Sequence, residues 1–365
     1  MSSLRAASTS WTLALLGSAA ICAAQGPAES SEEHARRYLT LVEEAAAHRA
    51  GADAGKWIAR VDEQRADVRR AWTWTLEHAP AEDVLRFAMA VGVLWERSRP
   101  ADAREVVEQA LQRTSTEPAS GRRAELLHRA GVLAFRQNDA ATARARMEAS
   151  LAVARQLSDK PRQALALTGL AQVALRENPA SVLAYADEAT ALYRELEDRR
   201  GAGAPLHMKA EAARMLGDPR AEALYEESLA LSRELQDWGR VATELHNMAY
   251  VKLQKKKTTE ADQLFRDSWK LFRELSVRDM DPYIYGGLAS VAAADGRAQR
   301  AAQLFGAADQ LFDTLKAAPD PADKAEMDRY AAMAKSQLGE TAYQAAYDRG
   351  RTLNTESATA LAEVR

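Results

Sequence analysis

The sequence predicts an all-α fold, a solenoid of antiparallel helix pairs that repeats about every 40 residues. Alanine, leucine, glutamate and arginine dominate, with only 18 glycines and 11 prolines in 365 residues, as a mostly helical chain requires. At six places a small residue is followed four positions later by a larger apolar one, and the small residues are 40, 38, 40, 40 and 40 positions apart. The pairs are Ala103/Val107, Ala143/Met147, Ser181/Tyr185, Ala221/Tyr225, Ala261/Phe265 and Ala301/Phe305. Such an array presents a long curved surface and no inherent catalytic pocket, which favours a binding scaffold.

Residues 1–29 are expected to form a leader. One arginine precedes an apolar stretch from Trp11 to Ala24, and small residues lie just before Gln25, where a signal peptidase would cut. The stretch is too short to span a bilayer, which takes roughly 20 apolar residues. Two interpretations stay open. Either the chain is cytoplasmic and the leader precedes the first helix, which we take as the primary expectation, or a weak signal peptide exports the chain to the cell envelope.

An N-terminal helical segment is predicted over residues 30–80. Ser31 is followed by two glutamates, which is typical of a helix start. Apolar residues then recur at helical spacing, including Leu39, Trp57 and Trp72, so we expect two or three packed helices with tryptophans in the core.

Residues 81–316 contain the regular array. Polar runs at 137–139, 177–179 and 216–219 have the turn chemistry that separates two helices. Twelve positions before each small residue lies the middle of the unit's first helix, occupied by Gly131, Gly169, Lys209, Ala249 and Ala289. At several of these crossings only a hydrogen or methyl group fits, and the larger residue four positions on fills the adjacent hollow. Units end in related runs with leucines at 157, 196, 235 and 275, and residues 317–365 are expected to be capping helices.

Composition and motifs argue against several classes of chemistry. The 49 basic residues nearly balance 52 acidic ones, so no basic field favours direct nucleic-acid binding. A single cysteine, Cys22, excludes an internal disulfide and a cysteine zinc site. The six histidines are scattered without metal-binding spacing, and neither a phosphate-binding loop nor a nucleophile-elbow motif occurs. We therefore expect no enzyme, no cofactor and no metal.

The small residue at a helix crossing, followed by alanine and then a bulky residue, resembles the tetratricopeptide repeat, which implies a right-handed superhelix. This chain departs from that family in its longer period and in mostly lacking the family's tryptophan and closing proline. The runs 286–296, 300–308 and 338–343, with Asp62–Ala71, resemble the C-terminal repeat arm of LuxR, AfsR and MalT-type ATPase transcriptional regulators. That resemblance covers roughly residues 34–360 and lacks their ATPase and DNA-binding parts. It implies a sensor arm that takes a ligand or an inhibitory protein.

The expected function is a regulatory scaffold that binds a protein or peptide partner in its concave groove, where the resemblance places first-helix side chains. His128 and His246 occupy the same position of their units, and Phe135 and Tyr250 lie nearby. Such side chains can hold an extended peptide by stacking and hydrogen bonding. They can equally be packing between adjacent repeats. The alternatives of an exported scaffold, an enzyme of unrecognised class and a truncated regulator stay open, and the sequence does not give the oligomeric state.

Replacing Ala261 with leucine should overpack its helix crossing and lower the stability of the fold by about 1–3 kcal/mol. Thermal unfolding of the variant and the parent chain measures the effect. An unchanged melting temperature would contradict the proposed register.

Overall fold

The computed structural model describes residues 30–49 and 53–364, and every regular element in them is an α-helix. The predicted leader over 1–29 lies outside the described residues. The helices are α1 (Ser31–Ala47), α2 (Ala54–Glu63), α3 (Arg65–His78), α4 (Ala81–Leu94), α5 (Pro100–Arg113), α6 (Gly121–Arg136), α7 (Ala140–Gln156), α8 (Lys160–Glu177), α9 (Pro179–Glu195), α10 (Gly203–Met215), α11 (Ala221–Glu234), α12 (Trp238–Gln254), α13 (Thr258–Glu274), α14 (Asp281–Ala294), α15 (Ala298–Leu315), α16 (Pro321–Leu338), α17 (Glu340–Arg351) and α18 (Thr355–Glu363). None of the helices in this part of the chain has the length and apolar character needed to cross a membrane.

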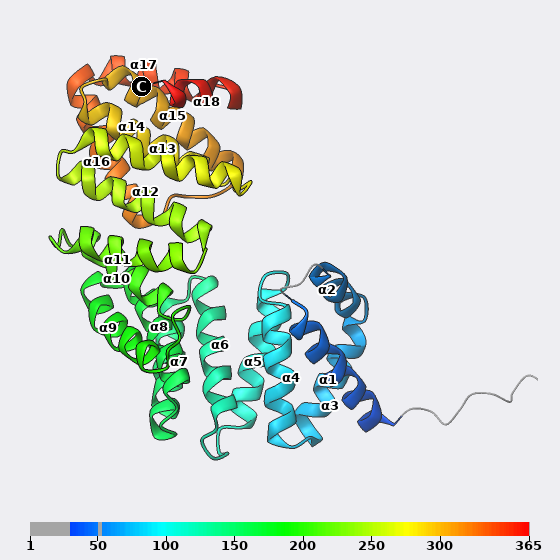
Figure 1. Cartoon of the computed structure of the whole chain (residues 1–365). Coiled ribbons are helices and arrows are strands. Elements are labelled where there is room, and N and C mark those ends of the chain that lie inside the picture. Colours follow the sequence, from blue (N-terminus) through cyan, green and yellow to red (C-terminus); the bar gives the residue numbers. More distant parts are fainter. Residues whose placement is uncertain (1–29, 50–52, 365) are drawn as a thin grey trace, which may run out of the picture.

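The helices form a curved array of antiparallel pairs, which confirms the predicted all-α solenoid (Figure 1). Six pairs run from α4/α5 to α14/α15, with α1 to α3 before them and α16 to α18 after them. The first helices of successive pairs contact one another from α4 through α14, and α16 continues this row. These helices therefore make the inner layer of the array, and the second helices cover it from outside.

Close crossings of the two helices in a pair set the geometry of the array. Met147 of α7 packs between two glycines, Gly131 of α6 and Gly169 of α8. A Cβ atom on Gly131 would lie 2.8 Å from the Met147 Cε atom, and one on Gly169 would lie 2.5 Å from its Sδ atom. Neither contact is sterically possible without a shift, so the predicted alternation of small and large residues is confirmed at this crossing.

One of the six predicted pairs is off by one position. In α9 the buried residues are Val182 and Ala186, both 0 % exposed, and Ser181 and Tyr185 are only half-buried. The Ser181 hydroxyl instead accepts a hydrogen bond of 2.9 Å from the side chain of Asn178 at the start of the helix. A polar side chain that is satisfied at a helix terminus leaves the buried position to its apolar neighbour, so the repeat is more even here than the sequence pattern indicated.

The units end as the repeated leucine runs predicted. Leu157, Leu196, Leu235 and Leu275 are the C-cap residues of α7, α9, α11 and α13. The residue after each leucine adopts the left-handed conformation, as Ser158 does with φ 55°. In this capping motif the amide of Ser158 donates to Arg155 and that of Asp159 to Ala154, which satisfies carbonyls at the helix end.

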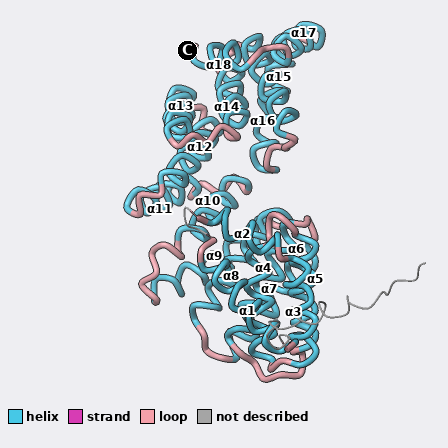
Figure 2. The backbone as a smooth tube through the Cα atoms, turned by 90° about the vertical axis from the view of Figure 1, so that its right-hand side faces the viewer, coloured by secondary structure: helices cyan, strands magenta, loops and turns pink. Residues whose placement is uncertain are grey.

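The C-terminal helices break the pairing rule. Helix α17 packs against α15, and the two backbones touch at Gly306 and Gly350. A Cβ atom on Gly350 would lie 2.0 Å from the carbonyl oxygen of Gln303. Helix α16 lies beside α14, and its first turns extend past α14 to α12 and α10 (Figure 2). The start of α16 thereby enters the inner face of the array.

Replacing Gly350 with alanine should force α15 and α17 apart and destabilise the chain by about 1–3 kcal/mol. Gly203 offers a matched control, since a Cβ atom there meets nothing within 4 Å. Differential scanning calorimetry should show a lower melting temperature for Gly350→Ala only. Equal melting temperatures for the two variants would mean that the backbones do not approach as closely as described.

Candidate partner-binding groove

The inner face contains two clefts, one on each side of the start of α16. The smaller, of about 150 Å³, is lined by Phe135 of α6, Arg176 of α8, residues of α10 and the chain at 320–322. The larger, of about 480 Å³, is lined by the end of α10, by Gln254 of α12 and by residues 321–329. The first turns of α16 thus occupy a groove whose walls come from four successive first helices.

Asp323 of α16 anchors this segment. One oxygen of its carboxylate accepts a hydrogen bond of 3.0 Å from Arg214 Nη2 of α10, and the other lies 3.1 Å from His246 Nε2 of α12. All three residues are buried, with exposed fractions of 6 %, 2 % and 1 %. Burial alone would raise the pKa of Asp323, but the charges and hydrogen bonds of His246 and Arg214 outweigh it and lower the pKa to about 2. The carboxylate is therefore ionised and tightly held.

Aromatic rings form the wall behind this anchor. The ring of Tyr250, which is 0 % exposed, meets the rings of His246 and Phe265 edge to face at 5.3 Å and 5.0 Å between centroids. The Arg214 guanidinium lies over the Tyr250 ring at 5.3 Å. One helical turn further along α16, Glu326 accepts a hydrogen bond of 2.5 Å from the side chain of Gln254. The segment is thus fastened by polar contacts against a rigid wall.

Many polar atoms of this cluster are buried without a hydrogen bond. They are Arg214 Nε and Nη1, Tyr225 Oη, Glu244 Oε2, His246 Nδ1, Tyr250 Oη and Glu326 Oε2, and they make up more than half of such side-chain atoms in the described residues. An unsatisfied buried polar atom costs about 1–3 kcal/mol, and folded proteins contain few of them. Their concentration at one place marks it as functionally unusual.

A second ionic group lies beside the anchor. His207 Nδ1 of α10 lies 2.8 Å from Glu244 Oε1 of α12, and the Ser228 hydroxyl donates to the same oxygen at 2.7 Å. Glu211 Oε2 lies 3.4 Å from the other ring nitrogen. Burial alone would lower the pKa of His207, but the two carboxylates raise it to about 9. This group ties α10, α11 and α12 together beneath the groove.

The four residues proposed from the sequence lie at different depths. His246 and Tyr250 are buried against the start of α16, in the anchor cluster. Phe135 is half-buried and lines the smaller cleft, with the Arg176 guanidinium 4.1 Å from its ring centroid. His128 lies next to Gly169 of α8, where burial and the nearby Arg129 lower its pKa to about 4. Three of the four are thus close to α16, and His128 is half-buried between α6 and α8.

Sequence reasoning missed Arg214 and Asp323, although they form the centre of the cluster. The two residues are 109 positions apart, and Asp323 lies in the segment that the sequence predicts to cap the array. One signal was present, since Arg214 follows the alanines Ala210, Ala212 and Ala213, which are all buried. A charged side chain on such a face needs a partner from elsewhere in the fold.

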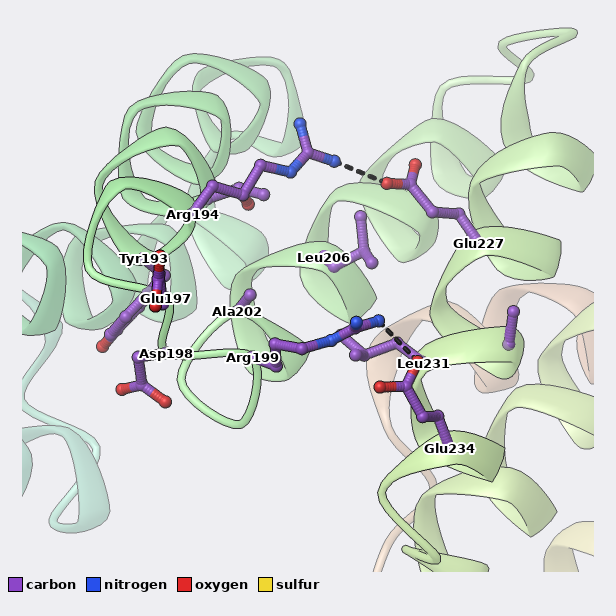
Figure 3. A pocket seen from close by; sticks show the side chains of 12 residues that line it. Tyr193, Arg194, Glu197, Asp198, Arg199, Ala202, Leu206, Glu227, Leu231 and Glu234 are labelled. Carbon is purple, nitrogen blue, oxygen red and sulfur yellow. Dashed lines mark hydrogen bonds and ion pairs between the residues drawn. The ribbon is translucent and has the colours of Figure 1, made fainter.

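The outer surface has a larger cleft, of about 720 Å³, between α9, α10 and α11 (Figure 3). Its rim carries two ion pairs, Arg194–Glu227 at 2.7 Å and Arg199–Glu234 at 2.5 Å. Equivalent pairs, Arg155–Glu188 and Lys160–Glu195, join the preceding units. The rim is therefore a feature of repeat stacking, and its exposed pairs each contribute about 0–1 kcal/mol.

No group of three or more histidine, cysteine or acidic side chains in the described ranges has the geometry to hold a metal ion.

Comparisons with known proteins agree on the fold. No protein-family model matches the chain, and no curated protein does. Among solved structures it is similar to a Rap protein complexed with competence and sporulation factor, at 15 % identity and a TM-score of 0.54, over 92 % of this chain and 90 % of that one. It is also similar to NprR in complex with its cognate peptide NprX, at 14 % identity, TM-score 0.51, and 90 % and 92 % coverage. A third match is a signal-transduction ATPase with a tetratricopeptide repeat sensor from Pyrococcus horikoshii, at 13 % identity and TM-score 0.51. It covers 91 % of this chain and 54 % of that one.

These likenesses show a tetratricopeptide-like helical solenoid. At this level of identity they show the fold alone.

Stability should depend on pH through His207. Because its pKa in the folded chain is about 9, above the ordinary 6.5, its pairing stabilises the fold fully below 6.5 and this contribution is lost as the pH rises through 9. The gap in free energy of unfolding between the parent chain and His207→Gln should therefore shrink from about pH 6 to about pH 10. Urea unfolding at several pH values measures it. The control is His78→Gln, at an exposed histidine of α3, whose difference in free energy of unfolding from the parent chain should not show this trend. A difference for His207→Gln that stays constant with pH would contradict the assigned role of His207.

Proposed function

We propose that the chain is a non-enzymatic sensor module that binds a peptide, or an extended segment of a protein, in the groove of its inner face. One observation carries the proposal, namely that the start of α16 already lies in this groove and makes side-chain contacts with α10 and α12. The groove thus accepts a short stretch of polypeptide through charged, amide and aromatic side chains. The similar solenoid of NprR, matched over 92 % of its length, has been solved with its cognate peptide.

We assign the contacts by depth. Phe135 is the residue open to an incoming partner, because its ring lines the smaller cleft beside Arg176. His246 and Tyr250 form the wall against which a bound segment packs, as the start of α16 does. His128 lies at the crossing of α6 and α8, against Gly169, and we assign it a supporting role. Aromatic anchors of this kind commonly contribute most of the binding free energy.

The resemblance to the arms of multidomain ATPase regulators, together with the fold shared with a repeat sensor of a signal-transduction ATPase, supports a regulatory role. In this role binding in the groove changes the state of a partner protein, which then acts on transcription or signalling. The near balance of 49 basic and 52 acidic residues disfavours direct contact with nucleic acid. We place this activity in the cytoplasm.

Peptide display tests the proposal. A random peptide library is selected on the purified full chain, and the affinities of the selected peptides are measured by fluorescence anisotropy. Phe135→Ala should weaken their binding about tenfold or more, because it removes an aromatic anchor from the groove.

The matched control is Trp238→Ala, which removes an exposed aromatic ring at the first residue of α12. This variant should bind the peptides with unchanged affinity. Selection of no peptide at all, or of peptides that bind Phe135→Ala as tightly as the parent chain, would count against a groove for peptides.

A further inference from the structure

The two halves of α16 are held in different ways. The second half packs by apolar contacts into the C-terminal core through Met327, Tyr330 and Ala334. The packing is tight, since a Cβ atom on Gly286 of α14 would lie 2.5 Å from Met327 Cε. The first half is fastened mainly by the polar contacts of Asp323 and Glu326. Polar contacts of this kind can be exchanged for equivalent ones from another chain, whereas the apolar half stays in place.

The anchor is incompletely satisfied by α16. Of the five N–H donors of Arg214, only one, on Nη2, is hydrogen-bonded to a carboxylate, and Nε and Nη1 are buried without an acidic partner. His246 Nδ1, on the same wall, also has no hydrogen-bond partner. A guanidinium can hold a carboxylate through two parallel hydrogen bonds, and Asp323 uses only one. The site therefore has more capacity for a carboxylate than its present occupant fills.

Acidic side chains recur along the segment in the groove. Asp320, Asp323 and Glu326 are spaced three residues apart, and they face Arg176, Arg214 and Gln254 from the inner wall. The wall complements the segment in charge and hydrogen bonding at Asp323, and in hydrogen bonding at Glu326. The segment thus shows which chemistry the wall recognises.

We propose that Arg214 and His246 form a carboxylate subsite of the groove, and that this subsite takes an acidic side chain of the bound peptide. Asp323 occupies the subsite until the peptide displaces the first turns of α16. This inference rests on the proposed function and adds two things to it, the acidic character of the partner and an internal competitor. A tethered segment is present at an effective concentration of about millimolar, so only a peptide that uses the subsite better can replace it.

The decisive experiment uses a labelled synthetic peptide with the sequence of residues 316–330 as the probe, and the full chain as its receptor. A second probe carries Asn in place of Asp323. The Asp323→Asn chain should bind the acidic probe at least tenfold more tightly than the parent chain does, because its own competitor is weakened. The acidic probe should also bind at least tenfold more tightly than the Asn probe.

Asp328→Asn is the matched control, since Asp328 lies on the same helix and its exposed carboxylate pairs only with Lys324. It should bind the acidic probe as weakly as the parent chain. Equal binding by all three chains overturns the internal competitor, and equal binding of the two probes overturns the carboxylate subsite.

Two measurements on the parent chain hold even where Asp323→Asn fails to fold. At millimolar concentration the parent chain should still prefer the acidic probe, because the competitor lowers both affinities by the same factor. Amide hydrogen exchange at residues 321–326 should become faster when this probe binds, and that at 330–338 should not. Absence of the preference, or unchanged exchange at 321–326, overturns the proposal.

Failure of this inference can be told apart from failure of the proposed function. One outcome is that displayed peptides require Phe135 for binding and yet bind the parent chain and Asp323→Asn with equal affinity. That result would support the peptide groove and overturn the carboxylate subsite. Probe binding that depends on Asp323 but not on Phe135 would support the subsite and restrict the groove to α10 and α12.

Discussion

The close crossing of helices within and between units is the constraint on which the rest of the structure depends. Met147 can lie between α6 and α8 only because both helices present a glycine to it, and a Cβ atom on Gly169 would come within 2.5 Å of its sulfur. Repeated along the array, such crossings fix the spacing of the first helices and make them a continuous inner layer. The groove is a product of this spacing, because its walls are first helices from four consecutive units.

The same constraint explains why the C-terminal end departs from the repeat. Glycines at 306 and 350 let α15 and α17 approach until their backbones touch, and α17 then occupies the place beside α15. Helix α16 stays in the inner layer, and its first turns extend into the groove, where Arg214 and His246 hold Asp323. The glycine contact thus holds α17 on α15, while the first turns of α16 lie on the inner face.

The sequence carried enough information to predict the fold because repeat packing is local. A small residue, a large residue and a capping leucine recur in every unit, and five of the six small–large pairs are in their predicted register, Ser181/Tyr185 being the exception. The cluster at Arg214 could not be predicted in this way, since it depends on where α16 lies and joins residues 109 positions apart. His246 and Tyr250 were singled out by their place in the repeat, but the acidic residue against them was not, because a single carboxylate among many carries no periodic signal.

We propose that one groove serves both α16 and an acidic partner. The most direct test is a crystal structure of the full chain with a displayed peptide bound. We expect an acidic side chain of the peptide on Arg214 and His246, Phe135 against the peptide, and the first turns of α16 displaced from the inner face. A peptide bound in the outer cleft between α9 and α11, with Asp323 still on Arg214, would contradict it.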